Sequence, residues 1–170
     1  MRYYEPTDLS RDYTVEIHIA DIHFGSINPE NQFAILYEQF LNKIATINFD
    51  ILSIDGDIFD KKFMANSDAV MYAMEFVRLC TELCIQKQAT MIIISGTESH
   101  DAGQLKLFYG YKDDERLDIR IVEKAQFEYA QGLKILCVPE EYGKGELYYH
   151  NILDDVYDTA FIHGTVVGSV

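Results

Sequence analysis

Short runs of hydrophobic residues alternate along the chain with longer segments in which hydrophobic residues recur every three or four positions. The runs predict β-strands over residues 15–20, 50–54, 91–94 and 160–162. The longer segments, residues 31–44 and 67–85, each carry the single apolar stripe of an amphipathic helix. This alternation of strand and helix predicts an α/β fold, with a mainly parallel sheet and flanking helices on its faces.

Smaller elements complete the expected fold. The second helix should begin at an N-cap formed by Asn66 or Ser67. Residues 105–111 have a short helical pattern, and residues 120–122 have the pattern of a short strand. Residues 127–138 predict a hairpin with Gly132 in its turn. Because no repeat, low-complexity tract or linker divides the chain, we expect residues 1–170 to form one domain.

Each of the four strands predicted over residues 15–20, 50–54, 91–94 and 160–162 is followed by carboxylate or histidine side chains. They are Asp21, His23, Asp57, Asp60, His100 and His163. Side chains that follow parallel strands meet at the carboxyl edge of the sheet. Carboxylates and imidazoles are good ligands for divalent cations, and two such ions about 3.5 to 4 Å apart can clamp a phosphate and activate a water. The pattern therefore predicts a two-metal phosphoesterase site, in which Asp57 could bridge the ions.

Each motif alone is weak, because aspartate and histidine are common in turns. The order of the motifs and their places after strands favour the metal interpretation. We expect His18, inside a predicted strand, to be packed, and His150 to be structural or exposed. Cys80 and Cys84 lie on the apolar face of the second helix, which favours core packing over metal binding.

Composition restricts the class of protein. The chain has 170 residues, 48% of them hydrophobic, and a formal net charge of -14. No apolar run approaches the roughly 20 residues that span a bilayer, and residues 1–6 lack a secretory pattern. Three cysteines without a framework spacing favour the reducing cytoplasm, so we expect a cytoplasmic protein with no membrane partner. The acidic charge should repel nucleic acid unless something offsets it.

Four segments resemble motifs of the calcineurin-like metallophosphoesterase superfamily, and in particular of the SbcD-type nucleases of DNA repair and recombination complexes. Residues 18–25 (His-Ile-Ala-Asp-Ile-His-Phe-Gly) resemble the family's first motif. Residues 56–60, 99–101 and 161–164 are similar to its later motifs, and residues 138–140 fit the strand before its later histidine. The resemblance implies the metallophosphoesterase sandwich, a mainly parallel sheet with flanking helices.

The resemblance also implies a role for each motif residue. Asp21 and His23 would bind the first metal ion, Asp57 would bridge both ions, and His163 would bind the second. His100 would lie over the phosphate and assist the leaving oxygen, oriented by Asp60 or Asp101. The implied cofactors are two divalent ions, with manganese the usual activating metal.

Two features depart from the family. Its Gly-Asn-His segment corresponds here to residues 96–100 (Gly-Thr-Glu-Ser-His), so the amide ligand is replaced, either by the Ser99 hydroxyl or by the Glu98 carboxylate. The final Gly-x-His-x-His motif is missing, since only residues 164–170 follow His163. We therefore expect the chain to lack the C-terminal part of the fold and to have little activity on its own.

The resemblance implies a metal-dependent DNA nuclease subunit, acting as exonuclease or endonuclease, with DNA and an SbcC-like ATPase as partners and a homodimer as its assembly. Two other functions stay open. A small-substrate metallophosphodiesterase or phosphatase would tolerate the acidic surface better. A non-catalytic relative could keep the fold with only part of the site.

Overall fold

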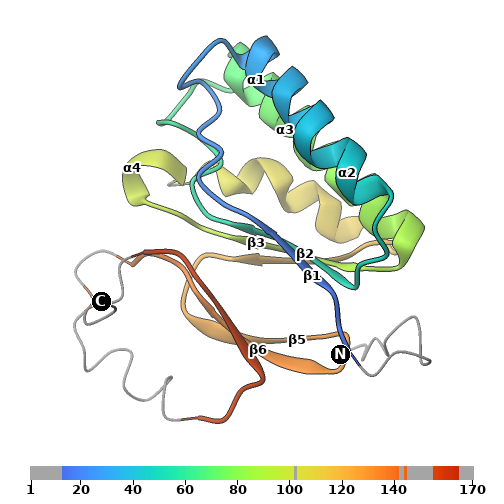
Figure 1. The fold of residues 1–170 in the computed structure, drawn as a ribbon. Coiled ribbons are helices and arrows are strands. Elements are labelled where there is room, and N and C mark those ends of the chain that lie inside the picture. Colours follow the sequence, from blue (N-terminus) through green and yellow to red (C-terminus); the bar gives the residue numbers. More distant parts are fainter. Residues whose placement is uncertain (1–12, 102, 142–143, 145–154, 165–170) are drawn as a thin grey trace, which may run out of the picture.

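Two β-sheets face each other, and helices cover the outer face of the larger sheet (Figure 1). The computed structural model describes residues 13–101, 103–141, 144 and 155–164. In the larger sheet, all neighbouring strands are parallel and follow sequence order: β1 (Glu16–Ile19), β2 (Ile51–Asp55), β3 (Thr90–Ile94) and β4 (Asp118–Val122). The predicted parallel α/β arrangement is confirmed.

The smaller sheet contains the predicted hairpin. Its strands are β5 (Gln126–Ala130), β6 (Leu133–Val138) and β7 (Thr159–Ile162), with β5 antiparallel and β7 parallel to β6. Gln131 and Gly132 connect the hairpin with φ angles of 51° and 82°. Positive φ at both central residues suits a tight turn between twisted strands, which is why glycine is favoured there.

The helical layer matches the predicted amphipathic segments. α1 (Pro29–Leu36), the π-helical turn η1 (Tyr37–Leu41) and α2 (Asn42–Ala45) follow one another without a break, and α3 is Asp68–Lys87. The Ser67 side chain accepts a hydrogen bond from the Val70 backbone, so Ser67 is the N-cap. η2 (Leu105–Asp113), predicted as a short helix, is a 3₁₀-helix, and the short helix α4 is Glu98–Asp101.

Helices cover one face of the parallel sheet, whereas the sequence pattern predicted helices on its faces. The strands follow one another across the sheet in sequence order, and right-handed crossovers then place every connection on the same side. The other face packs against the smaller sheet through a second core. Its members from the larger sheet are Ile51, Ile92, Ile94 and Val122, and those from the smaller sheet are Ala130, Ile135, Cys137 and Phe161.

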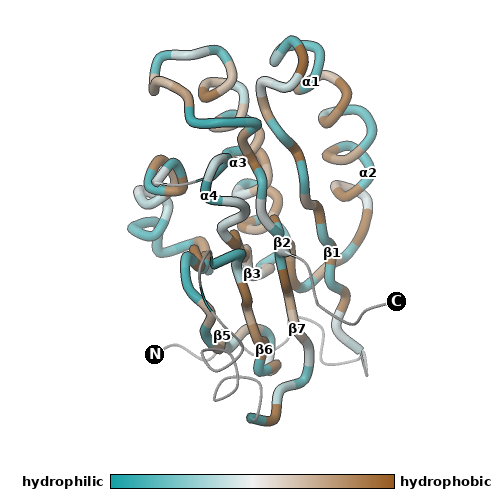
Figure 2. Tube along the Cα trace, turned by 90° about the vertical axis from the view of Figure 1, so that its left-hand side faces the viewer, coloured by the Kyte–Doolittle hydropathy of each residue, from teal (hydrophilic) through white to brown (hydrophobic). Residues whose placement is uncertain are grey.

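Alternate residues along the central strands therefore serve different cores. Leu52 and Ile54 of β2 belong to the core under the helices, while Ile51 belongs to the core between the sheets. Figure 2 shows β2 and β3 as largely hydrophobic stretches of the trace. A strand buried on both faces is apolar at nearly every position, so its sequence does not reveal whether a helix or a sheet covers each face.

Cys80 and Cys84 of α3 are completely buried, which confirms core packing. Burial raises the pKa of the Cys84 thiol to about 12.

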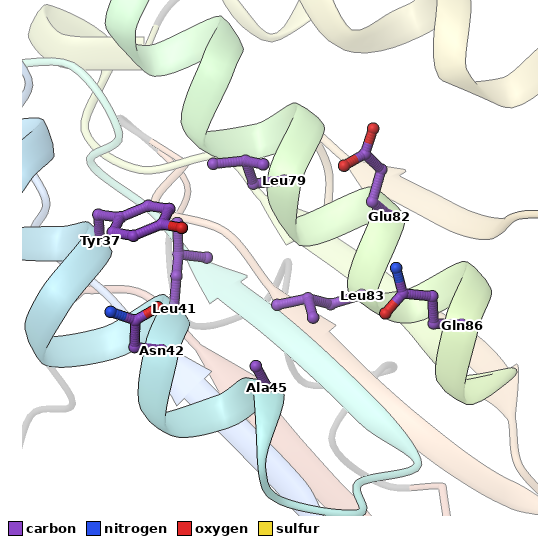
Figure 3. A pocket seen from close by; sticks show the side chains of 8 residues that line it. All are labelled: Tyr37, Leu41, Asn42, Ala45, Leu79, Glu82, Leu83 and Gln86. Atoms are coloured by element: carbon purple, nitrogen blue, oxygen red, sulfur yellow. The ribbon is translucent and has the colours of Figure 1, made fainter.

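A separate cavity of about 200 Å³ lies between the α1–α2 segment and α3. In Figure 3, Leu79 and Leu83 of α3 point toward Tyr37 and Leu41 across this cavity. No helix in the described part of the chain has the length and apolar character needed to cross a bilayer.

Ile92→Ala should lower the free energy of unfolding by about 2 to 5 kcal/mol, because the truncation leaves a cavity between the two sheets. Ile35→Ala is the control, since Ile35 is 55% exposed and its truncation should change stability by less than about 0.5 kcal/mol. Urea unfolding followed by circular dichroism measures both variants. Equal stabilities would contradict a tightly packed core between the sheets.

Candidate metal centre

The segments that follow β1 and β2 run side by side beyond the ends of their strands. The backbone N–H of Asp21 donates to the Gly56 carbonyl at 3.2 Å, and that of His23 donates to the Asp57 carbonyl at 2.9 Å. The next pair, Phe24 N–H to the Ile58 carbonyl, measures 2.8 Å. These bonds continue the parallel pairing, so residues far apart in sequence meet at the carboxyl edge of the sheet.

Asp21, His23 and Asp57 share an unusual backbone conformation, each with a φ angle of 52°. This left-handed region costs most L-residues on the order of 1 to 3 kcal/mol. The other described non-glycine residues with positive φ are Gln88 and Gln131, at a helix C-cap and a hairpin turn where such angles are routine. Strain of this kind concentrates at functional sites, and here it coincides with three predicted ligands.

Two groups of side chains in the described residues could each hold a metal ion. One contains His23, Asp57 and His100, and the other contains Asp21, Asp57 and His163. Within each group, the possible ligand atoms lie within 4.8 Å of one another. Asp57 belongs to both groups, which is the position that a bridging carboxylate requires.

The two groups differ from the predicted ligand sets: His100, predicted to lie over the phosphate, groups with His23 and Asp57, and Asp21 changes groups. Asp21 was expected beside His23 on the first ion, but it groups with His163. Its Oδ1 atom nevertheless lies 3.7 Å from the His23 Nε2 atom. Asp21 therefore stands between the two groups, and its 66% exposed side chain can turn toward either.

Asp57 is the most enclosed member of the cluster, at 4% exposure. Its Oδ1 atom accepts from the Thr97 backbone at 2.6 Å, and Oδ2 lies 3.0 Å from the His100 Nδ1 atom and 3.5 Å from His163 Nε2. Burial acts to raise the pKa of Asp57, but the hydrogen bonds from His100 and Thr97 and the histidine charges outweigh it. The pKa of Asp57 therefore lies below its usual value, and the side chain is anionic at neutral pH, as a metal ligand requires.

The ring of His163 is held by a backbone hydrogen bond. Its Nδ1 atom lies 2.6 Å from the Asp55 carbonyl oxygen, which can only accept, so Nδ1 carries the proton. The lone pair is then on Nε2, the nitrogen nearer Asp57. Metal-binding histidines are commonly oriented by such a bond on their other nitrogen.

His23 lacks a normal hydrogen bond on either ring nitrogen. Its Nδ1 atom is buried without a partner among the described residues. Its Nε2 atom lies 3.7 Å from Asp21 and 3.8 Å from Asp57, too far for hydrogen bonds. A cation bound to Nε2 would satisfy the side chain on that side. Together with the carboxylate and imidazole donors, this arrangement fits a divalent metal ion.

Neither Asp60 nor Asp101 takes the predicted position that orients the His100 ring. No hydrogen bond or ion pair within the described residues joins the Asp60 carboxylate to His100, whose Nδ1 atom faces Asp57 instead. Asp101 is completely buried and accepts hydrogen bonds from the Phe59 and Gly96 backbones. These bonds hold the loop after β2 against the loop after β3. Burial raises the pKa of Asp101. Ser99 is exposed.

His18 belongs to neither candidate group, as predicted, but it is an exposed residue and not a packed one. Its Nδ1 atom lies 2.7 Å from the Asp55 carboxylate, and its ring meets Phe161 edge-on with centroids 4.5 Å apart. The hydrogen bond to Asp55 raises the pKa of His18 against the opposing effect of burial. His150 lies outside the described residues.

The structure adds three residues that the sequence pattern did not single out. The Thr97 hydroxyl contacts both Asp57 and Glu140, and the Gln32 amide holds the loop that carries Asp21 and His23. Glu140 could have been found, because it follows a strand as the other acidic residues do. Thr97 and Gln32 have no such signal, since neutral polar residues are common at strand and helix ends.

No family model matches the chain, and no curated protein matches it. Among solved structures, it is similar to a protein of unknown function from Aquifex aeolicus, with 19% sequence identity and a TM-score of 0.34. The match covers 81% of this chain and 66% of that protein, so the chain spans just under two thirds of the neighbour's length. Function therefore has to be inferred from the chemistry of the site itself.

Asp57→Asn should weaken Mn²⁺ binding at both groups by at least about 10- to 100-fold, because the shared carboxylate loses its charge. Asp21→Asn should weaken mainly one ion. Asp60→Asn, which removes the same charge outside both groups, is the matched control. Calorimetric titration with Mn²⁺, together with paramagnetic resonance of the bound ion, measures each variant. Equal losses in Asp57→Asn and Asp60→Asn would contradict a shared ligand.

Gly96→Ala should disturb the centre without changing any ligand. An added Cβ would lie 2.1 Å from the Asp57 Oδ1 atom and 2.2 Å from its backbone nitrogen, and the backbone cannot move aside as a flexible side chain would. Gly110→Ala is the control, because a Cβ there meets nothing within 4 Å. We expect lower thermal stability and weaker Mn²⁺ binding only in Gly96→Ala. Unchanged binding in that variant would show that the close approach of Gly96 to Asp57 is dispensable.

Proposed function

We propose that this protein is a two-metal phosphodiesterase of the calcineurin-like metallophosphoesterase superfamily. One observation carries the proposal: Asp57 is shared by two His and Asp groups at the carboxyl edge of a parallel sheet. The left-handed backbone of Asp21, His23 and Asp57 supports it, since three strained residues at one place call for a functional reason.

Some residues of the proposed site would bind the metal ions, and another would act on the substrate. Asp57, His23, Asp21 and His163 would hold two divalent ions, which when bound neutralise phosphate charge and lower the pKa of an attacking water. Asp57 stays ionised because its pKa is lowered. His163 is kept in the correct tautomer by the Asp55 carbonyl.

His100 is placed to move a proton. Its Nδ1 atom is engaged with Asp57 at 3.0 Å, which leaves Nε2 available to donate to the leaving oxygen of a substrate. The side chain is 28% exposed, so a substrate can reach it. His100 could instead act as a third ligand beside His23 and Asp57. Metal binding and activity of a His100 variant distinguish the two roles.

The substrate proposed from the sequence resemblance is DNA, cut by a nuclease subunit that works with an SbcC-like ATPase. Manganese is the proposed metal, and a homodimer is the proposed assembly. The net charge of -14 favours a second candidate, a small phosphodiester or phosphomonoester, because the acidic surface would repel a polyanion. In the nuclease proposal, the partner would have to supply the DNA contacts.

Mn²⁺-dependent hydrolysis tests the proposal. We expect slow turnover of bis(p-nitrophenyl) phosphate that chelation abolishes and that Asp57→Asn reduces to background. A single-stranded oligonucleotide and p-nitrophenyl phosphate, assayed in parallel, separate nuclease, phosphodiesterase and phosphatase activities. Turnover that persists unchanged in Asp57→Asn, or the absence of both Mn²⁺ binding and Mn²⁺-dependent turnover, would contradict the proposal.

A second variant separates the two uses of His100. If His100 moves a proton, His100→Gln should lower turnover by about 100-fold or more while Mn²⁺ binding is retained. If His100 is a ligand, the same variant should lose an ion. Calorimetry on the variant, beside its activity, gives the answer.

A further inference from the structure

The Thr97 hydroxyl lies between two carboxylates that come from different sheets. Its Oγ1 atom is 3.2 Å from Asp57 Oδ2 and 2.9 Å from Glu140 Oε2. A hydroxyl has one proton, so it can donate to only one of these oxygens at a time. The other carboxylate then faces a hydroxyl lone pair at hydrogen-bond distance, a repulsive arrangement unless a proton or a cation lies close by.

No lysine or arginine within the described residues supplies that positive charge. Among the described residues, the ion pairs of Asp57 are with histidines, and no lysine or arginine pairs with Asp57 or Glu140. Asp57 also belongs to the candidate group that contains His163. The oxygens of Thr97, Asp57 and Glu140 therefore form a chain of close contacts in which, among the described residues, histidines are the basic partners of Asp57.

The strands explain how Glu140 reaches this position. Glu140 follows β6 by two residues, and β6 pairs in parallel with β7, whose end carries His163. The His163 backbone N–H donates to the Val138 carbonyl at 2.9 Å, so the segments that carry Glu140 and His163 leave the smaller sheet together. The smaller sheet thus delivers two potential ligands to Asp57, which belongs to the larger sheet.

We propose that the Thr97 hydroxyl and the Glu140 carboxylate complete the ligand set of the metal ion held by Asp57 and His163. The inference rests on the proposed two-metal site and adds two ligands to it. Carboxylate and hydroxyl oxygens are hard donors that suit Mn²⁺ and Mg²⁺. This assignment gives the ion at His163 the oxygen ligand that we expected from Ser99 or Glu98, both of which are exposed.

Paired substitutions test the two ligands by metal binding. Glu140→Gln should weaken one of the two Mn²⁺ ions by about 10- to 100-fold and leave the other unchanged. Glu141→Gln is the matched control, because it removes the same charge at the next residue and keeps an oxygen that can accept from the Ala125 backbone. Thr97→Val should weaken the same ion, whereas Thr97→Ser should preserve it. The Thr97 backbone bond to Asp57 remains in all four variants.

Calorimetric titration with Mn²⁺ counts the ions, and anomalous diffraction from crystals soaked in Mn²⁺ locates them. Manganese within bonding distance of Glu140 and Thr97, with selective loss in Glu140→Gln and Thr97→Val, would support the inference. Equal binding by Glu140→Gln and Glu141→Gln would overturn it and favour a proton shared between the carboxylates. If Asp57→Asn still loses both ions in that case, the proposed two-metal function stands without these ligands. If the unmodified chain binds no Mn²⁺, both proposals fail.

Discussion

The candidate centre depends on the backbone hydrogen bonds between the segments that follow β1 and β2. These bonds place Asp21 and His23 against Asp57, and they hold all three residues in the left-handed region of φ. The strained conformation is tolerated because the surrounding backbone is fixed on both sides, with Phe24 and Phe59 buried beneath it. The buried Asp101 carboxylate adds support by tying Phe59 to Gly96.

The two sheets contribute differently to this centre. The larger sheet supplies Asp21, His23, Asp57 and His100 from the ends of its parallel strands. The smaller sheet supplies His163 and brings Glu140 near Thr97. The apolar core between the sheets sets their separation, so packing at Ile92 and its neighbours also fixes how close the ligands of one sheet come to those of the other. Histidines lie beside Asp21 and Asp57 and offset the repulsion between these carboxylates.

Much of the fold was predictable because its signals are local. Ser67 caps α3, the Gln131-Gly132 turn closes the hairpin, and the periodic stripe of residues 67–85 packs inward, all as the sequence indicates. The layer arrangement was not predictable in the same way. Apolar residues at successive positions of β2 and β3 require cover on both faces, but a helix and a sheet satisfy that requirement equally well.

The sequence by itself determined which side chains reach the carboxyl edge of the sheet, because a residue that directly follows a parallel strand lies at that edge. It thereby named Asp21, His23, Asp57 and His100 as neighbours at that edge, and it also named His163, although His163 follows β7 of the smaller sheet. Only the tertiary structure decided how they pair. It turned His100 toward Asp57, left Ser99 exposed, and brought Thr97 and Glu140 together across two sheets. Those outcomes depend on loop backbone angles and on the packing distance between layers, and no short segment of sequence encodes either one.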